Sequence, residues 1–248
     1  MKKTVIITGG NKGIGLNISK VFAENKYTVF VGAREKTKEL EALHGDITFV
    51  STNVKFEKDH QNLVKVAINK TGRLDTYINN AGFSAWRSIS NIDEKFLNNM
   101  LDTNLKGVFW GCKSALAVMK TGANIINISS IAGKRGSSNN SAYSSCKFGV
   151  NAITQSLSKE VGKKNIRVNA VCPVIIETDG LIEALNEKES PAYGNVEQFI
   201  KNFKNTQAAL PELPTGNQVG EACLFLASEN ASAITGQCIN VDCGVFPQ

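Results

Sequence analysis

The chain has 248 residues, 42% of them hydrophobic and 20% charged, a composition typical of a globular protein with a core of its own. Its formal net charge is +6, but lysine and arginine are scattered in runs of at most two without interleaved aromatic residues, so we expect no nucleic-acid partner. The first apolar run ends in glycines after four residues, unlike a secretory signal, and none approaches the ~18 residues of a membrane span, so we expect a cytoplasmic protein without a membrane partner.

Short apolar runs rich in β-branched residues alternate with longer segments of helical period. We expect strands at residues 4–8, 27–33, 47–51, 74–80, 124–129, 166–171 and 237–242. We expect helices at residues 14–24, 57–70, 93–119, 142–161 and 217–228. The alternation predicts an α/β fold, a single Rossmann-type doubly wound domain over residues 1–248 whose seven-stranded parallel sheet is flanked by helices on both faces. Such sheets bind ligands at the carboxyl ends of their strands.

A glycine-rich turn, TGGNKGIG at residues 8–15, follows the first strand directly and precedes a helix. Glycines at 9, 13 and 15 permit a tight turn, a close backbone approach and an unobstructed helix start. The start of the helix then offers free amides and a positive dipole end to a pyrophosphate. This position between strand and helix predicts a dinucleotide site.

The tip of the second strand indicates which dinucleotide binds. A carboxylate there normally accepts hydrogen bonds from the adenosine ribose of NAD(H), but Ala33 occupies that place and Arg34 follows it. Lys12 lies in the glycine turn close to the same ribose. Two cations without an acid favour a 2′-phosphate, and therefore NADP(H) over NAD(H). Glu35 is the alternative acid if the register differs by two residues.

Two arginines are candidates for substrate binding. Trp86 and Arg87 lie in the loop that leaves the carboxyl edge of the sheet after the fourth strand, where they could hold an apolar group and an anion. Arg135, five residues beyond Ser130, is the second candidate. The alternative for Arg87 is a surface arginine that pairs with Asp93 or with Glu94.

Three residues predict carbonyl–alcohol chemistry. Tyr143 and Lys147 are four residues apart, so on a helix they share one face, and the lysine ammonium is expected to lower the tyrosine pKa toward the range of a general acid or base. Ser130 precedes the tyrosine by thirteen residues and could hydrogen-bond the same substrate oxygen. Ser129 is the alternative hydroxyl, but strand alternation places it on the opposite side.

Residues 175–216 form the only long stretch without a clear element, because Pro191, Gly194, Pro211 and Pro214 break its helical fragments. We interpret it as a lid over the substrate cleft, with a variable surface excursion as the alternative. The six cysteines form no CxxC pair and there are only two histidines, so we expect reduced, buried thiols and no metal site.

The motifs resemble the short-chain dehydrogenase/reductase family essentially from end to end. They comprise the glycine turn at 8–15, NNAG at 79–82, TNLKGVF at 103–109, ISS at 128–130, YSSCK at 143–147, NAVCP at 169–173 with Thr178, and GQCINVDCG at 236–244. Together, in this order and spacing, they are specific. The chain departs from the family pattern where Asn53-Val54 replaces Asp-Val, Pro173-Val174 replaces Pro-Gly, and Asp242-Cys243-Gly244 replaces Asp-Gly-Gly.

The resemblance implies a role for each catalytic residue. Tyr143 would protonate the carbonyl oxygen, and Lys147 would lower the Tyr143 pKa and hold the ribose next to the nicotinamide. Ser130 would orient the substrate oxygen, and Asn104 would anchor a water in a proton relay beyond Lys147. Together with the glycine turn and the second strand, the residues expected to bind the cofactor are Gly9, Asn11, Lys12, Gly13, Ile14, Gly15, Arg34, Asn53, Val54, Asn80, Ala81, Gly82, Tyr143, Lys147, Pro173, Ile176 and Thr178.

We therefore expect an NADP(H)-dependent oxidoreductase that interconverts a carbonyl and a secondary alcohol on a small metabolite. The candidate substrates are a β-ketoacyl thioester, a polyol or sugar ketone, and an oxo-acid. The alternative is a non-catalytic NADP(H)-binding regulatory or structural protein, against which the presence of Tyr143 and Lys147 argues. The resemblance also implies a homotetramer or a homodimer.

Overall fold

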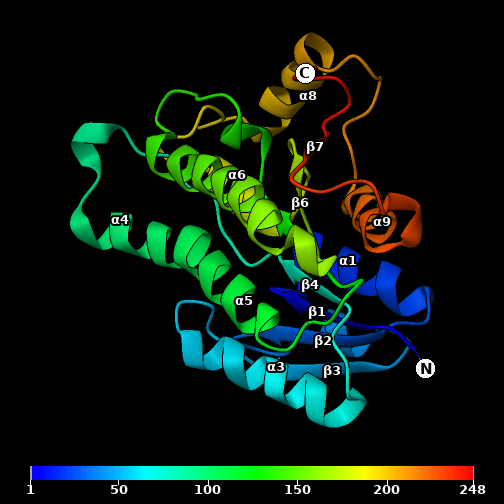
Figure 1. Cartoon of the computed structure of the whole chain (residues 1–248). Coiled ribbons are helices and arrows are strands. Elements are labelled where there is room, and N and C mark those ends of the chain that lie inside the picture. Colours follow the sequence, from blue (N-terminus) through cyan, green and yellow to red (C-terminus); the bar gives the residue numbers. More distant parts are fainter. Residues whose placement is uncertain (1, 248) are drawn as a thin grey trace.

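The computed structural model describes residues 2–247, which form a seven-stranded parallel sheet between two layers of helices (Figure 1). The strand order is β3-β2-β1-β4-β5-β6-β7. The strands are β1 (Thr4–Thr8), β2 (Thr28–Ala33), β3 (Ile47–Ser51), β4 (Thr76–Asn79), β5 (Asn124–Ile128), β6 (Arg167–Pro173) and β7 (Cys238–Val241). The predicted α/β fold, with a seven-stranded parallel sheet and helices on both faces, is confirmed.

The sheet has a switch point between β1 and β4. Strand β1 pairs with β2 on one side and with β4 on the other, because the chain runs outward to β3 and then returns to the centre. The connections that leave the carboxyl ends of β1 and β4 therefore run toward opposite halves of the sheet. In doubly wound folds this is where a ligand crevice forms.

Alternate residues of each strand face different helical layers, which explains why the central strands are apolar throughout. Val5 and Ile7 of β1 pack with α1 (Gly13–Glu24) and α9 (Gly216–Ala227), whereas Ile6 faces α3 (Glu57–Thr71), α5 (Gly107–Leu116) and α6 (Ser141–Val161). Figure 1 shows α1 and α9 together on one side of the sheet and α3 and α5 on the other. All five side chains of β1 are buried, as expected for a strand covered on both faces.

The helix predicted over residues 93–119 is wrong as a single element. The structure has α4 (Glu94–Leu101), one π-helical turn, η2 (Asp102–Lys106), and then α5. The π turn inserts an extra residue into the helical repeat and so changes the face that the following helix presents. As a result α4 packs on α6, while α5 packs on α3 and β4.

The segment over residues 175–216 is more regular than its prolines suggested. It contains α7 (Asp179–Leu185) and α8 (Val196–Gln207), with Pro191 and Gly194 in the turn between them. Residues of both helices pack into a small apolar cluster that includes Leu185 and Ile200, and Trp86 joins it from the loop after β4. Figure 1 shows α8 above the ends of β6 and β7.

Shorter elements complete the described chain. Helix α2 (Lys38–Glu41) follows β2 and was not expected, and the 3-10 turns are η1 (Ile89–Asn91), η3 (Ile131–Gly133), η4 (Gly162–Lys164) and η5 (Glu229–Ala231).

Four of the six cysteines are buried, but Cys238 and Cys243 are partly exposed, so the expectation of buried thiols is wrong for these two. Within residues 2–247 no helix combines the length and apolar character needed to cross a membrane.

Candidate active site

The glycine-rich turn between β1 and α1 has the backbone of a phosphate cradle. Gly9 and Gly13 adopt φ values of 64° and 53°, in the left-handed region that favours glycine. A Cβ atom on Gly15 would lie 2.1 Å from the Gly9 carbonyl oxygen, so this position accepts no side chain. Helix α1 begins at Gly13 with no acidic residue in its first turn, which leaves its positive end available to an anion.

Two asparagines hold this turn in place. Asn80, at the end of β4, donates from Nδ2 to the carbonyl oxygens of Thr8 at 2.9 Å and Gly9 at 3.1 Å. Asn11 donates to the Glu35 carbonyl oxygen at 3.1 Å and so joins the turn to the end of β2. Asn11 and Asn80, both predicted to bind the cofactor, therefore use their side-chain amides to hold the backbone around the cofactor turn.

The hydroxyl of Thr8 is an organising group that the sequence analysis missed. It accepts hydrogen bonds from the main-chain N–H groups of Asn80 at 3.0 Å and of Ala81 at 3.1 Å. It thereby locks the NNAG segment onto β1 at the switch point. Thr37 was missed too, and its hydroxyl donates to the Asn11 carbonyl oxygen at 2.7 Å.

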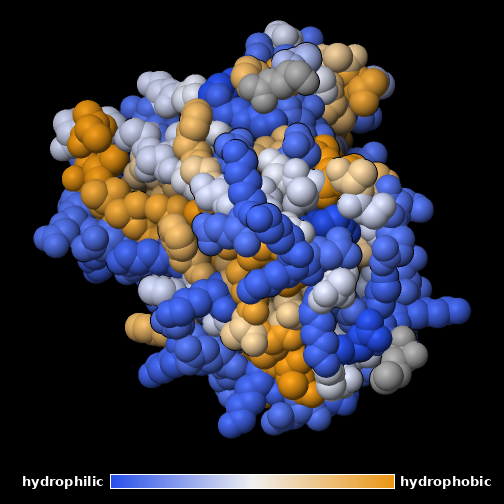
Figure 2. Space-filling model, in the orientation of Figure 1, coloured by the Kyte–Doolittle hydropathy of each residue, from blue (hydrophilic) through white to orange (hydrophobic). Residues whose placement is uncertain are grey.

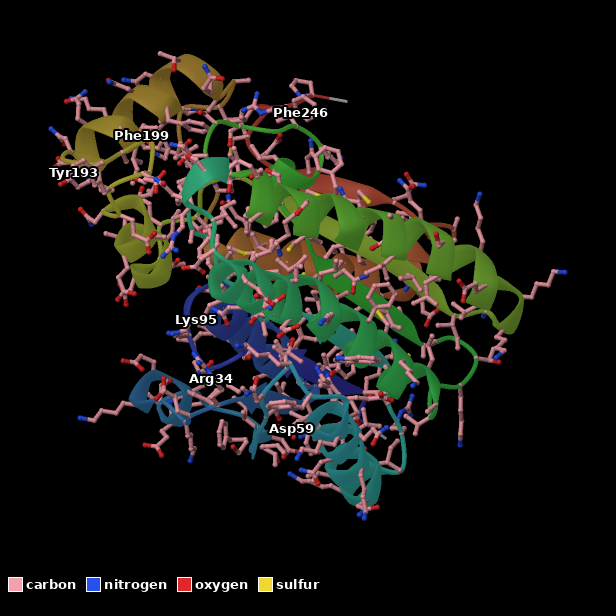
Figure 3. All side chains as sticks on the ribbon, turned by 90° about the vertical axis from the view of Figure 1, so that its left-hand side faces the viewer. Arg34, Asp59, Lys95, Tyr193, Phe199 and Phe246 are labelled. Carbon is pink, nitrogen blue, oxygen red and sulfur yellow. The ribbon has the colours of Figure 1, made fainter. Side chains whose placement is uncertain are left out.

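The cations expected to read a 2′-phosphate lie free at the end of β2. Lys12 and Arg34 are exposed, and within residues 2–247 neither side chain has a hydrogen-bond or ion-pair partner. Ala33 is buried, so it offers the ribose no acceptor. Glu35, the alternative acid, contacts the turn through its main-chain carbonyl. Figure 3 shows Arg34 on the same side of the molecule as Tyr193 and Phe199 of the 175–216 segment.

The loop after β3 is shaped by its own side chains. Asn53, which replaces the family's aspartate, accepts the Lys55 main-chain N–H on Oδ1 at 3.2 Å. Its own main-chain N–H donates to Asp59 Oδ2 at 2.8 Å. The side-chain oxygen of Asn53, a predicted cofactor-binding residue, thus already accepts a hydrogen bond within a turn, although a carbonyl oxygen has a second lone pair.

A buried histidine supports the same loop and was not anticipated. His60 Nε2 lies 3.0 Å from the Val54 carbonyl oxygen, and Nδ1 lies 2.8 Å from the Tyr77 hydroxyl. Because a carbonyl can only accept, Nε2 carries the proton and Nδ1 accepts from the tyrosine. Burial lowers the pKa of His60, which keeps it neutral. A lone histidine on a predicted helix gives no signal of this role.

Ser130, Tyr143 and Lys147 converge at the carboxyl end of β5. Ser130 caps η3 just after that strand, and its hydroxyl lies near enough to the Tyr143 phenol to act on the pKa of that group. Lys147 is buried, with its ammonium 2.8 Å from the Ile128 carbonyl oxygen and 5.6 Å from the centroid of the Tyr143 ring. Ser129 points the other way, with its hydroxyl on the Lys147 carbonyl at 3.2 Å. The structure thus brings the three predicted side chains together.

The expected direction of the tyrosine pKa shift is wrong for this arrangement. Burial raises the pKa of Tyr143 to about 12, and the neighbouring Ser130 hydroxyl opposes that rise only in part. Burial also lowers the pKa of Lys147 to about 8. Burial of the phenol therefore outweighs the groups around it that favour the ionised form. A phenol with a raised pKa stays protonated near neutrality and is therefore ready to donate.

Asn104 lies in the π-helical turn and is buried. Its Oδ1 accepts the Phe83 main-chain N–H at 3.0 Å, and its Nδ2 donates to the Met100 sulfur at 2.8 Å. A Cβ on Gly82 would come within 2.5 Å of the Asn104 Oδ1. The side chain therefore fixes the loop after NNAG beside the site, and the proton-relay role that the resemblance implies remains a prediction. π turns recur at functional sites.

The end of β6 closes the other side of the crevice. The Pro173 carbonyl oxygen lies 3.5 Å from the Ser130 hydroxyl, and Ile176 is buried against the core beside α1 and α9. Thr178 caps α7, and its Cγ2 lies 3.4 Å from where a Gly13 Cβ would be. Thr178 thus lies over the glycine turn, as a contact of the nicotinamide half would require.

The substrate candidates have other partners. Arg87 stacks on the Phe96 ring at 4.2 Å and has its Nη1 3.9 Å from Asp93 Oδ2, which is the surface pairing given as the alternative. Arg135 stacks on Phe246 at 5.4 Å from the ring centroid. Trp86 packs with α7 and α8. Anion binding by either arginine remains a prediction.

Taken as a whole, the site fits a phosphorylated dinucleotide. The cradle has no room for side chains at Gly15, and the cations at Lys12 and Arg34 are free. The buried ammonium of Lys147 has three donors and uses one on the Ile128 carbonyl, so donors remain for ribose hydroxyls. NADP(H) is the cofactor that matches these features.

Known proteins resemble the chain over nearly its whole length. The family model described as enoyl-(acyl carrier protein) reductase matches residues 9–246. The chain is 33% identical to a 3-oxoacyl-(acyl-carrier-protein) reductase of Chlamydia pneumoniae over 98% of this chain and 96% of the relative. It is 32% identical to the protein of the same name from Staphylococcus aureus, over 99% of each chain. A crystal structure of an actinorhodin polyketide ketoreductase variant with NADPH superposes with a TM-score of 0.89 at 27% identity, covering 98% of this chain and 97% of that one.

Proposed function

The chain belongs to the short-chain dehydrogenase/reductase family of oxidoreductases, and from this premise we propose that it reduces the 3-oxo group of an acyl thioester to a 3-hydroxyl with NADPH. Two kinds of observation support this substrate class over a polyol ketone or a free oxo-acid. The curated relatives described above are named 3-oxoacyl-(acyl-carrier-protein) reductases, and the structural neighbour is a polyketide ketoreductase.

The observation that carries the proposal is the convergence of Ser130, Tyr143 and Lys147 beside a dinucleotide cradle. A hydroxyl and a phenol that lie next to each other can both bind one carbonyl oxygen. The phenol, whose pKa burial raises to about 12, is protonated near neutrality. An oxygen that becomes negative as the carbonyl is reduced is the base that can take this proton.

Each residue then has a defined task in reduction. When bound, the reduced nicotinamide supplies the hydride that is added to the carbonyl carbon. Ser130 donates a hydrogen bond to the substrate oxygen and holds it against Tyr143, which transfers its phenolic proton to that oxygen. Lys147 holds ribose hydroxyls and places a positive charge under the phenolate that is left. Reprotonation of Tyr143 from solvent through Lys147 and Asn104 completes the cycle.

The cofactor preference follows from the end of β2. Lys12 and Arg34 are exposed and unpaired within the described residues, and the buried Ala33 offers no carboxylate to a ribose 2′-hydroxyl. A 2′-phosphate therefore gains two cations, whereas a 2′-hydroxyl gains no acceptor. We expect Arg34→Asp to shift the ratio of kcat/KM values toward NADH, and unchanged kinetics with both cofactors would contradict the assignment.

The decisive experiment is a substrate panel with NADPH, followed by absorbance of the nicotinamide. The panel contains a 3-oxoacyl thioester, the matching 2-enoyl thioester, a polyol ketone and an oxo-acid. We expect oxidation of NADPH with the 3-oxoacyl thioester above the other three, and its loss in Tyr143→Phe. Turnover of the enoyl thioester alone would favour the activity in the family model's description, and tight NADPH binding without turnover would favour a non-catalytic protein.

Two further properties belong to the proposal. The segment over residues 175–216 acts as a lid, because α7 starts at the glycine turn and α8 packs with Trp86 from the loop after β4.

The second property is that the protein forms a homotetramer or homodimer through α5 and α6, where Phe109 and Phe148 have exposed fractions of 52% and 47%. Figure 2 shows hydrophobic areas on this side of the molecule, separated by hydrophilic side chains. Light scattering in solution tests the second property, and a monomer at micromolar concentration would exclude it.

A further inference from the structure

The linker between α7 and α8 is joined to two loops of the site through one residue, Glu189. Its Oε2 accepts the main-chain N–H of Ser88 at 2.8 Å, and its Oε1 accepts from Asn91 Nδ2 at 3.0 Å. Its main-chain carbonyl accepts from Asn139 Nδ2 at 3.1 Å. Both carboxylate oxygens thus bind the loop after β4, which leads away from the active site.

Asn139 connects this contact to the catalytic helix. Its carbonyl oxygen accepts the Arg87 main-chain N–H at 2.7 Å, and its φ of 57° lies in the left-handed region that asparagine tolerates. It lies two residues before α6, the helix that carries Tyr143. Three segments, residues 83–92, 131–140 and 186–195, therefore meet at Glu189 and Asn139. We name the Glu189 carboxylate with its Ser88 and Asn91 donors the latch.

An apolar contact also joins the loop after β4 to the segment that contains α7 and α8. Trp86 from the loop after β4 packs with Leu185 at the end of α7 and with Ile200 of α8. The latch adds direction to this contact, since hydrogen bonds from a carboxylate fix an orientation that apolar packing does not. Displacing the linker would therefore also displace the indole ring.

The latch acts on the middle of the segment, at the linker between α7 and α8. At the start of the segment Thr178 is held against Gly13 of the cofactor turn. The neighbouring Glu187 is exposed and has no side-chain hydrogen bond or ion pair within residues 2–247. Loss of the latch therefore loosens the linker next to the substrate loop, while the start of the segment at the cofactor turn stays fixed.

We propose that Glu189 is a positioning residue that holds the 175–216 segment against the loop after β4 and so sets the affinity for the acyl substrate. This inference rests on the proposed reduction of a 3-oxoacyl thioester. It assigns Glu189 no contact with the reacting atoms. Substitution of Glu189 should therefore change the KM for the acyl substrate and the mobility of the linker. It should leave kcat and the KM for NADPH unchanged.

The first test compares Glu189→Ala with Glu187→Ala, which makes the same charge change two residues away. Loss of two hydrogen bonds to a carboxylate is expected to raise the KM for the 3-oxoacyl thioester about tenfold, with kcat and the KM for NADPH within about twofold. Amide hydrogen exchange over residues 181–200 should become faster in Glu189→Ala alone. Equal KM values and equal exchange in the two variants would overturn the proposal.

The second test exchanges the polarity of the latch. Glu189→Gln places an amide opposite the Asn91 amide, and Asn91→Asp places two carboxylates together, so each single variant should raise KM. In the double variant the Gln oxygen keeps the Ser88 N–H while its amide donates to the new aspartate, and KM should return to within about twofold of the unmodified enzyme. A double variant as impaired as the two single effects combined would also overturn the proposal.

The two tests separate the latch from the reaction. Hydrogen exchange needs no substrate, so it reports on the latch even if no 3-oxoacyl thioester is turned over. Absent turnover by the unmodified enzyme defeats the proposed function. Normal turnover with unchanged exchange and KM in Glu189→Ala defeats the latch alone. If Glu189→Ala does not fold, Asn91→Ala, which removes one donor from the other side, decides by the same readouts.

Discussion

The glycine turn at residues 8–15 and the segment at residues 175–216 meet at Gly13 and Thr178, yet they are held in different ways. The turn is fixed by the Asn80 amide, which donates to the carbonyl oxygens of Thr8 and Gly9, and by the Thr8 hydroxyl, which accepts the main-chain N–H of Ala81. These groups are partly buried. The segment is attached by one apolar cluster, by hydrogen bonds to Glu189, and by the main-chain N–H groups of Ala209 and Leu210, which donate to the Cys243 carbonyl oxygen. Tyr193 lies exposed on its surface.

This difference separates recognition of the cofactor from recognition of the substrate. The cofactor half depends on backbone geometry at the sheet edge, where few residue types are possible. The substrate half depends on attachments at the periphery that many residue types could provide. A family motif therefore identifies the first half, while the second half has to be read from the contacts of this particular chain.

The largest effect is expected from a substitution in the cofactor half, at Gly15. In Gly15→Ala the new Cβ would lie 2.1 Å from the Gly9 carbonyl oxygen, so the turn has to shift. Overpacking at such a site costs about 1–3 kcal/mol, and we expect the Kd for NADPH to rise about 100-fold. Fluorescence titration with NADPH measures it, and Gly136→Ala, at an open position, is the matched control.

The second prediction concerns the catalytic residues that lie between the two halves. The pKa of Lys147 is lowered to about 8, so its positive charge is present below that pH and is lost above it. We expect kcat/KM for reduction to fall about tenfold per pH unit above pH 8. The phenol of Tyr143, with its pKa raised to about 12, stays protonated there and is not the cause.

An alkaline limb that is unchanged in Lys147→Arg would contradict this assignment, because a guanidinium keeps its charge throughout the range. If Lys147→Arg retains activity, its profile should stay level through pH 9. Initial rates from pH 6 to 9.5 at saturating NADPH provide the measurement.

The substrate half can be tested at Trp86. Removal of the indole ring in Trp86→Ala takes away apolar contact between the loop after β4 and the helices α7 and α8. We expect the KM for the acyl substrate to rise about fivefold, with the Kd for NADPH within about twofold. An equal rise in both constants would mean that the two halves are not held independently.

The smallest effect concerns the free energy of unfolding and a residue of the cofactor half, His60. Burial lowers the pKa of His60 below its usual 6.5, so below pH 6.5 the unfolded chain binds a proton that the folded chain does not. Stability is therefore lost as the pH falls through 6.5, with a slope of up to about 1.4 kcal/mol per pH unit. Denaturant unfolding of His60→Gln should show a shallower slope between pH 6.5 and 5, whereas the exposed-site control His44→Gln should not.

The sequence predicts the sheet well because its strands are buried on both faces. The strand at residues 4–8 has the predicted bounds, since a short β-branched run that ends in glycines has one interpretation. The catalytic trio is also brought together as predicted, because an i, i+4 pair on a helix and a hydroxyl at a strand end have fixed positions.

The remaining features depend on contacts between segments that are distant in sequence. The helix predicted over residues 93–119 is broken at Asn104, whose partner Phe83 is twenty-one positions away. The pKa of Tyr143 rises where a fall was predicted, because burial depends on the whole fold. Arg87 was a substrate candidate, and its stacking on Phe96 follows from how α4 begins. Helical periodicity and local spacing contain none of this information.

The π turn at residues 102–106 fixes the number of residues between α4 and α5. Its additional residue lets α4 and α5 present different sides to their neighbours while they remain one continuous rod. Deletion of Thr103 would allow an uninterrupted α-helix in which everything before the deletion is rotated by about 100° relative to α5. Insertions and deletions are therefore expected to be tolerated far less in this stretch than conservative exchanges of its exposed side chains.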